Sequence, residues 1–260
     1  MAEVHVALAA EKLFQLGPLP ITNSFLTTWV VTLILIGFAF LATKKIEAVP
    51  KGLQNIAEFS IEAFQELVSS IAGDKTKVFM PIVATFFFFI IIGNYLGILP
   101  GIGSVGFFLP ADASHQAMQA GELHGGEKVF VPIFRSINSD LNTTLALALI
   151  SLFATHYLSI KYLGLDGYLA KFFSLNPIFL FVGLMEIVGE FTKILSLSFR
   201  LYGNIFAGEV LLTTASTKVF AYIVPIPFYF LEILVGFVQA LIFAMLTLVF
   251  MVILTQKASH

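Results

Sequence analysis

The sequence predicts an all-α integral membrane protein with about five transmembrane helices, one interfacial amphipathic helix and a long, steeply tilted C-terminal helical hairpin. Two observations lead to this prediction. Of the 260 residues, 58% are hydrophobic and 12% are charged, and the mean hydropathy is +0.94. A soluble domain carries about 25% charged residues, so this chain could not cover a water-facing surface. Several uncharged apolar runs also reach the length of about 20 residues that a membrane crossing requires.

Charge and cysteine content exclude several classes of protein. The net charge of −2 and the pI near 6.2 lack the basic footprint of a nucleic-acid binder. The chain has no cysteine, which excludes a disulfide framework, a thiol nucleophile and a thiolate metal site. The histidines and acids of the loop at 101–140 lack the spacing of metal ligands, so we expect no metal and no cofactor.

Residues 1–50 are expected to form an N-terminal tail and an anchor helix. The run at 21–43 is uncharged and is followed directly by Lys44 and Lys45. A cleavable signal peptide would place its basic residues before the apolar run, so this run is predicted to remain as an anchor.

Residues 51–77 are expected to form an amphipathic helix on the inner membrane surface. Apolar residues recur there at helical spacing, and Glu58, Glu62 and Glu66 form a stripe on the other face. This acidic stripe is either a solvated face or a docking face for a partner.

Residues 78–260 are expected to form a channel-forming membrane domain with spans at about 78–99, 141–160, 176–216 and 225–255. As one helix, the stretch 176–216 would be about 60 Å long, whereas the hydrocarbon layer is about 30 Å thick. It must therefore tilt steeply or break. Lysines gather in the connections that follow the first and third spans, which predicts an outer N-terminus and a cytoplasmic C-terminus.

The stretch 176–216 is unusual because charged residues interrupt its apolar sequence. They are Glu186, Glu190, Lys193, Arg200 and Glu209. Each charge at the centre of a membrane helix costs about 2.5–3.5 kcal/mol, so these residues must be paired or used. Glu186, Glu190 and Lys193 can pair with one another. Arg200 has no acidic residue one helical turn away, so its counter-charge must come from another helix or another subunit.

The last span adds two polar residues, Glu232 and Gln239. If the final two helices are antiparallel and turn near residue 220, Glu209 lies level with Glu232, and Arg200 lies level with Gln239. We therefore expect the two carboxylates to lie close together and to share one proton. His156, near the end of the third span, is expected at the membrane interface and not in a proton path.

Four segments resemble one known family. The sequence SFRLYGNIFAGE at 198–209 closely resembles the signature of subunit a of F-type ATP synthases. The sequences QALIFAMLT at 239–247, DLNTTL at 140–145 and NYLGILP at 94–100 are similar to further motifs of the family. Many members combine one acid with one histidine where this chain has Glu209 and Glu232.

The resemblance implies a non-catalytic, ion-translocating stator subunit with two long antiparallel helices beside a rotating ring of c subunits. Arg200 would face the carboxylates of the ring, with Asn204 and Gln239 beside it. Glu209 and Glu232 would line an outer aqueous half-channel, and Glu186 would belong to the inner one.

The resemblance also implies partners and a location. The partners would be the c-subunit ring, the peripheral-stalk b subunits, other ATP synthase subunits and the lipid bilayer, and the location an energy-coupling membrane such as the bacterial plasma membrane. The sequence leaves protons and sodium open as the transported ion. The alternative is a polytopic secondary transporter or an ion channel unrelated to a rotary motor, although the inverted repeats of many transporters are missing from the sequence.

Overall fold

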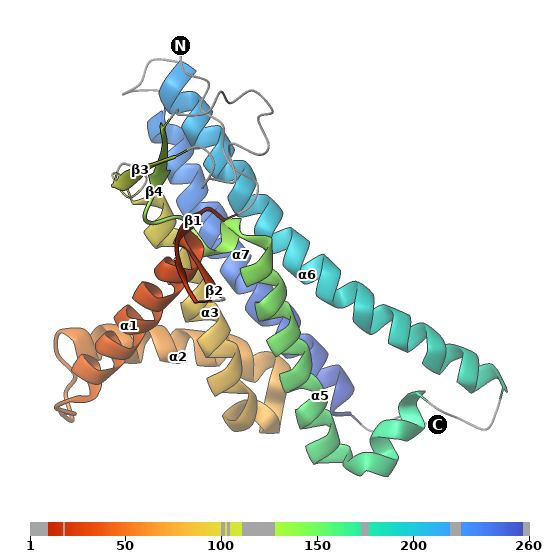
Figure 1. Ribbon diagram of the computed structural model, residues 1–260. Coiled ribbons are helices and arrows are strands. Elements are labelled where there is room, and N and C mark those ends of the chain that lie inside the picture. Colours follow the sequence, from red (N-terminus) through yellow and green to blue (C-terminus); the bar gives the residue numbers. More distant parts are fainter. Residues whose placement is uncertain are drawn as a thin grey trace. The chain divides into compact units, whose positions relative to one another are not determined.

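The computed structural model describes residues 10–17, 19–99, 102, 105–110, 128–172, 177–218 and 225–256. Long helices dominate these residues (Figure 1), which confirms the predicted all-α class. The helices are α1 (Asn23–Thr43), α2 (Leu53–Ala72), α3 (Thr76–Ile98), α5 (Leu141–Phe172), α6 (Pro177–Lys218) and α7 (Pro225–Leu254). Short 3₁₀ helices, η1 (Gly73–Lys75) and η4 (Ile137–Ser139), precede α3 and α5.

Two small antiparallel hairpins were not predicted from the sequence. Strand β1 (Lys12–Leu16) pairs with β2 (Leu19–Thr22), and β3 (Gly106–Pro110) pairs with β4 (Lys128–Pro132). Each hairpin has only four or five residues per strand, so its alternating pattern is too short to stand out in an apolar sequence.

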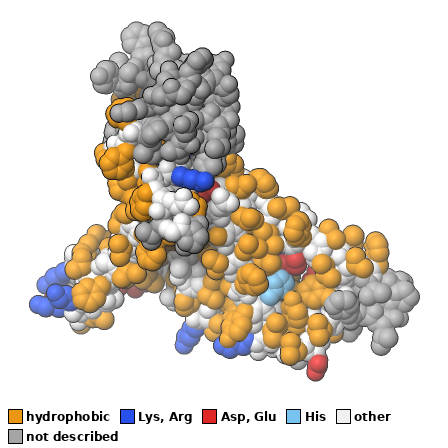
Figure 2. Space-filling view, viewed as in Figure 1, with side chains coloured by type: hydrophobic (Ala, Val, Ile, Leu, Met, Phe, Trp, Pro, Cys, Tyr) orange, Lys and Arg blue, Asp and Glu red, His pale blue; other side chains and the backbone are white. Residues whose placement is uncertain are grey.

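Four helical stretches among the described residues are long and apolar enough to cross a membrane. They are Asn23–Thr43, Leu53–Ile98, Leu141–Phe172 and Pro225–Leu254. A fifth long helix, α6, has 42 residues and carries the charged side chains. Large hydrophobic side chains are exposed along the long helices and cover much of the visible surface in Figure 2. Exposed apolar area on this scale requires lipid or partner subunits, so the chain is an integral membrane protein.

The chain divides into two compact units, and several long helices run through both. Unit one comprises Met1–Gly37, Phe88–Thr143 and Leu201–Ala240. Unit two comprises Phe38–Phe87, Thr144–Arg200 and Leu241–His260.

In unit one, the first hairpin is anchored to the start of α1. Thr22 Oγ1 accepts a hydrogen bond from the Phe25 amide at 3.2 Å and so caps the helix. Asn23 forms two hydrogen bonds with the backbone of Glu11. The backbone N–H of Asn23 donates to the Glu11 carbonyl oxygen at 3.0 Å, and the side-chain Oδ1 of Asn23 accepts from the Glu11 backbone N–H at 3.2 Å. The position of Glu11 is therefore fixed by backbone contacts.

In unit two, side chains from other segments donate hydrogen bonds to the last backbone carbonyl oxygens of α7. Ser159 Oγ and Lys171 Nζ donate to the Leu254 carbonyl oxygen at 2.7 and 2.8 Å, and Lys75 Nζ donates to the Thr255 carbonyl oxygen at 2.9 Å. The last carbonyl groups of a helix lack partners within the helix and carry partial negative charge, so two lysines stabilise this end.

Helix α5 is broken at Gly164, which has φ 74° and ψ 167°. A positive φ favours glycine because it has no Cβ. The residues after the break turn away from the axis of the helix (Figure 1). As a result, the Tyr168 hydroxyl lies 3.0 Å from His156 Nδ1, whereas twelve residues along a straight helix would span about 18 Å.

Candidate functional site

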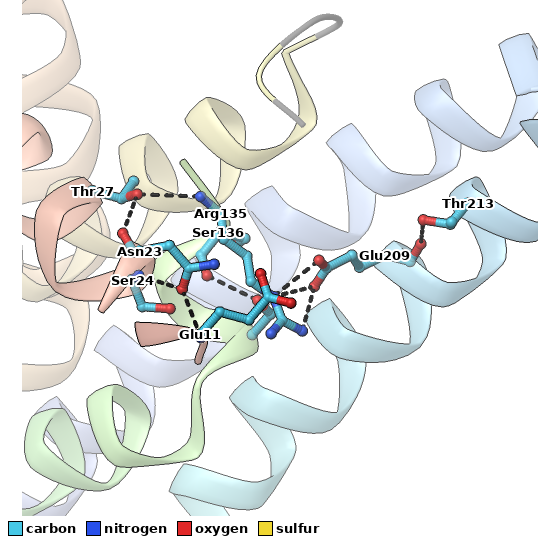
Figure 3. Close-up of polar contacts among 9 residues, drawn as sticks. Glu11, Asn23, Ser24, Thr27, Arg135, Ser136, Glu209 and Thr213 are labelled. Atoms are coloured by element: carbon cyan, nitrogen blue, oxygen red, sulfur yellow. Dashed lines mark hydrogen bonds and ion pairs between the residues drawn. The ribbon is translucent and has the colours of Figure 1, made fainter. Parts of the chain in front are cut away.

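Unit one contains a buried group of charged side chains, which we call the Arg135 cluster: Glu11, Arg135, Glu209 and Glu232. Arg135 Nε donates to Glu209 Oε1 at 3.0 Å, and Arg135 Nη2 donates to Glu209 Oε2 at 3.1 Å (Figure 3). The Arg135 side chain is 5% exposed and that of Glu209 is 29% exposed. The Arg135 amide also donates to Thr27 Oγ1 at 3.3 Å, which ties the arginine to α1.

Glu232 on helix α7 packs against Gly208 of α6, the residue before Glu209. A Cβ added to Gly208 would overlap the Glu232 carboxylate. Glycine at position 208 therefore makes the room that this carboxylate occupies. Glu232 is 3% exposed, and among the described residues it forms no ion pair. The two carboxylates thus lie on adjacent positions in very different surroundings: Arg135 compensates Glu209, and Glu232 has no such cation.

Glu11 brings a third carboxylate from the N-terminal hairpin. It is 2% exposed, and Figure 3 shows its side chain extending toward Arg135 and Glu209. A buried carboxylate is costly unless a cation or hydrogen-bond donors compensate it. In the Arg135 cluster one guanidinium therefore faces more negative charge than it can balance alone.

A ladder of amides joins α3, η4, α6 and α7 in the same unit. Asn204 Nδ2 donates to Gln239 Oε1 at 2.7 Å. Asn94 Nδ2 donates to the Gly236 carbonyl oxygen at 3.0 Å, and Asn138 Nδ2 donates to Asn94 Oδ1 at 2.7 Å. Asn94, Asn138 and Gln239 are buried, so these bonds fix the rotation of α7 about its axis.

Arg200 lies on an exposed face of α6 in unit two. Its Nη2 donates to Ser196 Oγ at 3.3 Å, and no carboxylate forms an ion pair with it among the described residues. Gln239, which the sequence placed level with Arg200, is bonded instead to Asn204, one helical turn beyond Arg200 on α6.

A second charged group, which we call the Glu190 cluster, comprises His156, Tyr168, Glu190 and Lys193 in unit two. Lys193 Nζ donates to Glu190 Oε1 at 2.6 Å, and His156 Nε2 lies 3.8 Å from Glu190 Oε2. The Glu190–Lys193 pair was one of the pairings that the sequence allowed. Glu186, one turn earlier on α6, is half-buried and interacts electrostatically with His156 and Tyr168.

Arg135 was not singled out from the sequence, although it is one of only two arginines in the chain. Arginine instead of lysine at this position indicates a carboxylate partner, because a guanidinium can bind a carboxylate through two parallel hydrogen bonds and an ammonium cannot. His156 is 20% exposed and contacts Tyr168 and Glu190, whereas its expected place at the membrane interface stays a prediction.

The fold and these clusters define a class: a polytopic helical membrane protein that holds charged and amide side chains within its long helices. The sequence profile of the ATP synthase A chain family matches residues 25–252. The chain belongs to this family, and its relatives cover nearly its whole length.

Three relatives named ATP synthase subunit a illustrate the match. The protein from Moorella thermoacetica is 31% identical over 239 residues, which is 92% of this chain and 93% of the relative. The protein from Syntrophobacter fumaroxidans is 34% identical over 86% of this chain and 80% of its own length. The protein from Gloeobacter violaceus is 35% identical over 90% of this chain and 84% of its own length.

Proposed function

We propose that the chain is the non-catalytic membrane stator subunit of an F-type ATP synthase. It forms two aqueous half-channels that carry protons to and from a rotating c-subunit ring, and Arg200 separates them. The observation that carries this proposal is the state of Arg200. It is an exposed cation in a long apolar helix, and no carboxylate compensates it within the described part of the chain. A carboxylate on the ring supplies the missing counter-charge.

The chemistry of guanidinium suits a barrier between two channels. Arginine keeps its proton at any working pH, so it does not pass protons along. A carboxylate on the ring that approaches Arg200 is favoured in its ionised form and must release its proton before it passes. Protons are therefore forced to travel with the rotor. Each proton that crosses 100 mV releases about 2.3 kcal/mol, which drives rotation.

The two clusters supply the half-channels on either side of Arg200 along α6. Glu209 and Glu232 of the Arg135 cluster line the outer path, and the bonded amides of Asn204 and Gln239 lie toward Arg200. Glu186 and the Glu190 cluster line the inner path. The N-terminus is outside and the C-terminus is cytoplasmic, and the peripheral-stalk b subunits hold this chain against the ring.

The test uses the whole ATP synthase complex in sealed vesicles, with Arg200→Ala in this chain. ATP synthesis driven by an imposed proton gradient should be lost, while the complex still assembles. Thr192→Ala is the control, because the exposed Thr192 hydroxyl donates to the Val188 carbonyl oxygen of its own helix and makes no other hydrogen bond within the described part of the chain. The proposal fails if the Arg200→Ala complex retains coupled synthesis. It also fails if the chain purifies as a functional solute transporter without a proteolipid ring.

A further inference from the structure

The Glu190 cluster contains a histidine that charge balance does not require. Lys193 already compensates Glu190 through the 2.6 Å contact, and the same ammonium lies 4.7 Å from the centre of the Phe250 ring. A second titratable side chain in a membrane helix adds cost without adding neutrality. His156 is nevertheless kept largely buried and bonded.

The break at Gly164 gives the imidazole a fixed orientation. Tyr168 occupies Nδ1 at 3.0 Å, so Nε2 is the nitrogen that faces Glu190. The 3.8 Å between Nε2 and Glu190 Oε2 is too long for a direct hydrogen bond, but it is within ion-pair distance of an imidazolium. A carboxylate beside the ring also stabilises the imidazolium form at that distance.

A small hollow adjoins the same carboxylate. It measures about 10 Å³ and is lined among others by Glu190, Lys193, Ser151 and Thr155. This volume is at the lower limit for one water molecule, and the lining offers the polar partners that such a molecule needs. Glu190 therefore both lines this hollow and lies 3.8 Å from His156 Nε2.

We propose that His156 is a proton carrier of the inner half-channel, with Glu190 as its positioning counter-charge. This inference rests on the proposed function. In the tautomer in which Nδ1–H donates to the Tyr168 hydroxyl oxygen, Nε2 has a free lone pair and takes a proton from a hydronium ion in the path. An N–H bond forms as an O–H bond breaks, and the imidazolium later returns the proton from Nε2 to water. Glu190 lies ten residues before Arg200 on α6, an axial distance of about 15 Å on the side away from Glu209.

Imidazole suits this task because it gains and loses a proton between about pH 5 and 8. The charged and titratable groups that face His156 are Glu190, Lys193 and Glu186 from α6 and Tyr168 from its own helix. Two carboxylates, one ammonium and one phenol therefore face the imidazole.

The first test is His156→Gln in the whole complex in sealed vesicles. Glutamine keeps a hydrogen-bonding group near Tyr168 but cannot carry a proton in this range. We expect passive proton conduction through the membrane sector to fall about tenfold. This loss is smaller than the factor of about 10²–10⁴ that a positioned acid–base group contributes to a reaction, because water molecules can still carry some protons past residue 156. Tyr168→Phe, which keeps the ring shape, should lower conduction less than His156→Gln does.

Chemical rescue separates proton transfer from packing. In His156→Ala, imidazole added on the cytoplasmic side should restore conduction, whereas pyrazole, of the same size but a much weaker base, should not. Equal rescue by both compounds, rescue from the outer side only, or wild-type conduction in the assembled variants would overturn the inference. If Arg200→Ala still abolishes coupled synthesis in those cases, the proposed function stands and only the role of His156 falls.

Discussion

The guanidinium of Arg135 holds the carboxylate of Glu209 through two parallel hydrogen bonds, at 3.0 and 3.1 Å, across 74 positions of sequence. The bond makes the surroundings of two neighbouring acids, Glu209 and Glu232, unequal. Glu209 is compensated and oriented, and Glu232 is buried beside Gly208 without a cation among the described residues. Of the two, Glu232 is the acid better placed to exchange a proton.

Removing the guanidinium alone should harm the protein more than removing the whole pair. Arg135→Gln leaves Glu209 as an uncompensated, partly buried charge, and breaking such a pair costs about 3–5 kcal/mol. The double variant Arg135→Gln/Glu209→Gln removes both charges and should recover part of the resistance of the complex to heat and detergent. The measurement is a double-mutant cycle with Glu209→Gln as the second single variant. Strictly additive losses would contradict the coupling.

Adding one methyl group at Gly208 should disturb the outer path. The new Cβ occupies the space of the Glu232 carboxylate, so Gly208→Ala must displace that side chain. Passive proton conduction should fall severalfold while helix α6 becomes no weaker, because alanine favours a helix by about 1 kcal/mol over glycine. Gly37→Ala is the matched control, since nothing lies within 4 Å of a Cβ on that residue of α1. Unchanged conduction in Gly208→Ala would show that the position of Glu232 is unimportant.

Lysine should not replace Arg200. An ammonium has no planar fork and loses its proton more readily in an apolar setting, so it can pass protons between the half-channels. Arg200→Lys vesicles should lose most of their coupled ATP synthesis despite the retained positive charge. The rate of ATP synthesis is measured against the amount of assembled complex. Synthesis at the wild-type rate would mean that charge alone is sufficient.

The orientation can be tested with single cysteines because the chain contains none. A cysteine at Gln15, in the first hairpin, should react with a membrane-impermeant maleimide from the outside. Cysteines at Ser69 of α2 and at Gln256 should react only from the cytoplasmic side. All three positions are exposed. Labelling of Gln15 and Ser69 from the same side would contradict the proposed topology.

The sequence was most informative where local composition decides the structure. The all-α membrane class follows from long uncharged runs, and the lack of an acidic residue one helical turn from Arg200 follows from its neighbours in the sequence. Both depend on residues within a few turns of one another, so no tertiary information was needed. The two hairpins were missed because strand patterns of four or five residues do not stand out among apolar neighbours.

The missing parts of the site depend on contacts between distant segments. Arg135 meets Glu209, and Asn94 meets Gly236, only after the chain has folded. The partners of His156 come from α6 and from beyond the break at Gly164, and neither neighbour is visible from spacing on one straight helix. A positive φ at a single glycine is a property of the folded backbone.

Helix α6 runs without a break from Pro177 to Lys218, so it sets the spacing of the polar groups that it carries. Each residue adds about 1.5 Å of length and about 100° of rotation, so the separations among Glu190, Arg200 and Glu209 are set by residue count alone. Inserting one residue between Arg200 and Glu209 would turn every later side chain by more than a quarter of a circle. An insertion of four residues would nearly restore the facing direction but lengthen the path by about 6 Å. Between Glu190 and Glu209, substitutions are therefore tolerated far more readily than insertions or deletions.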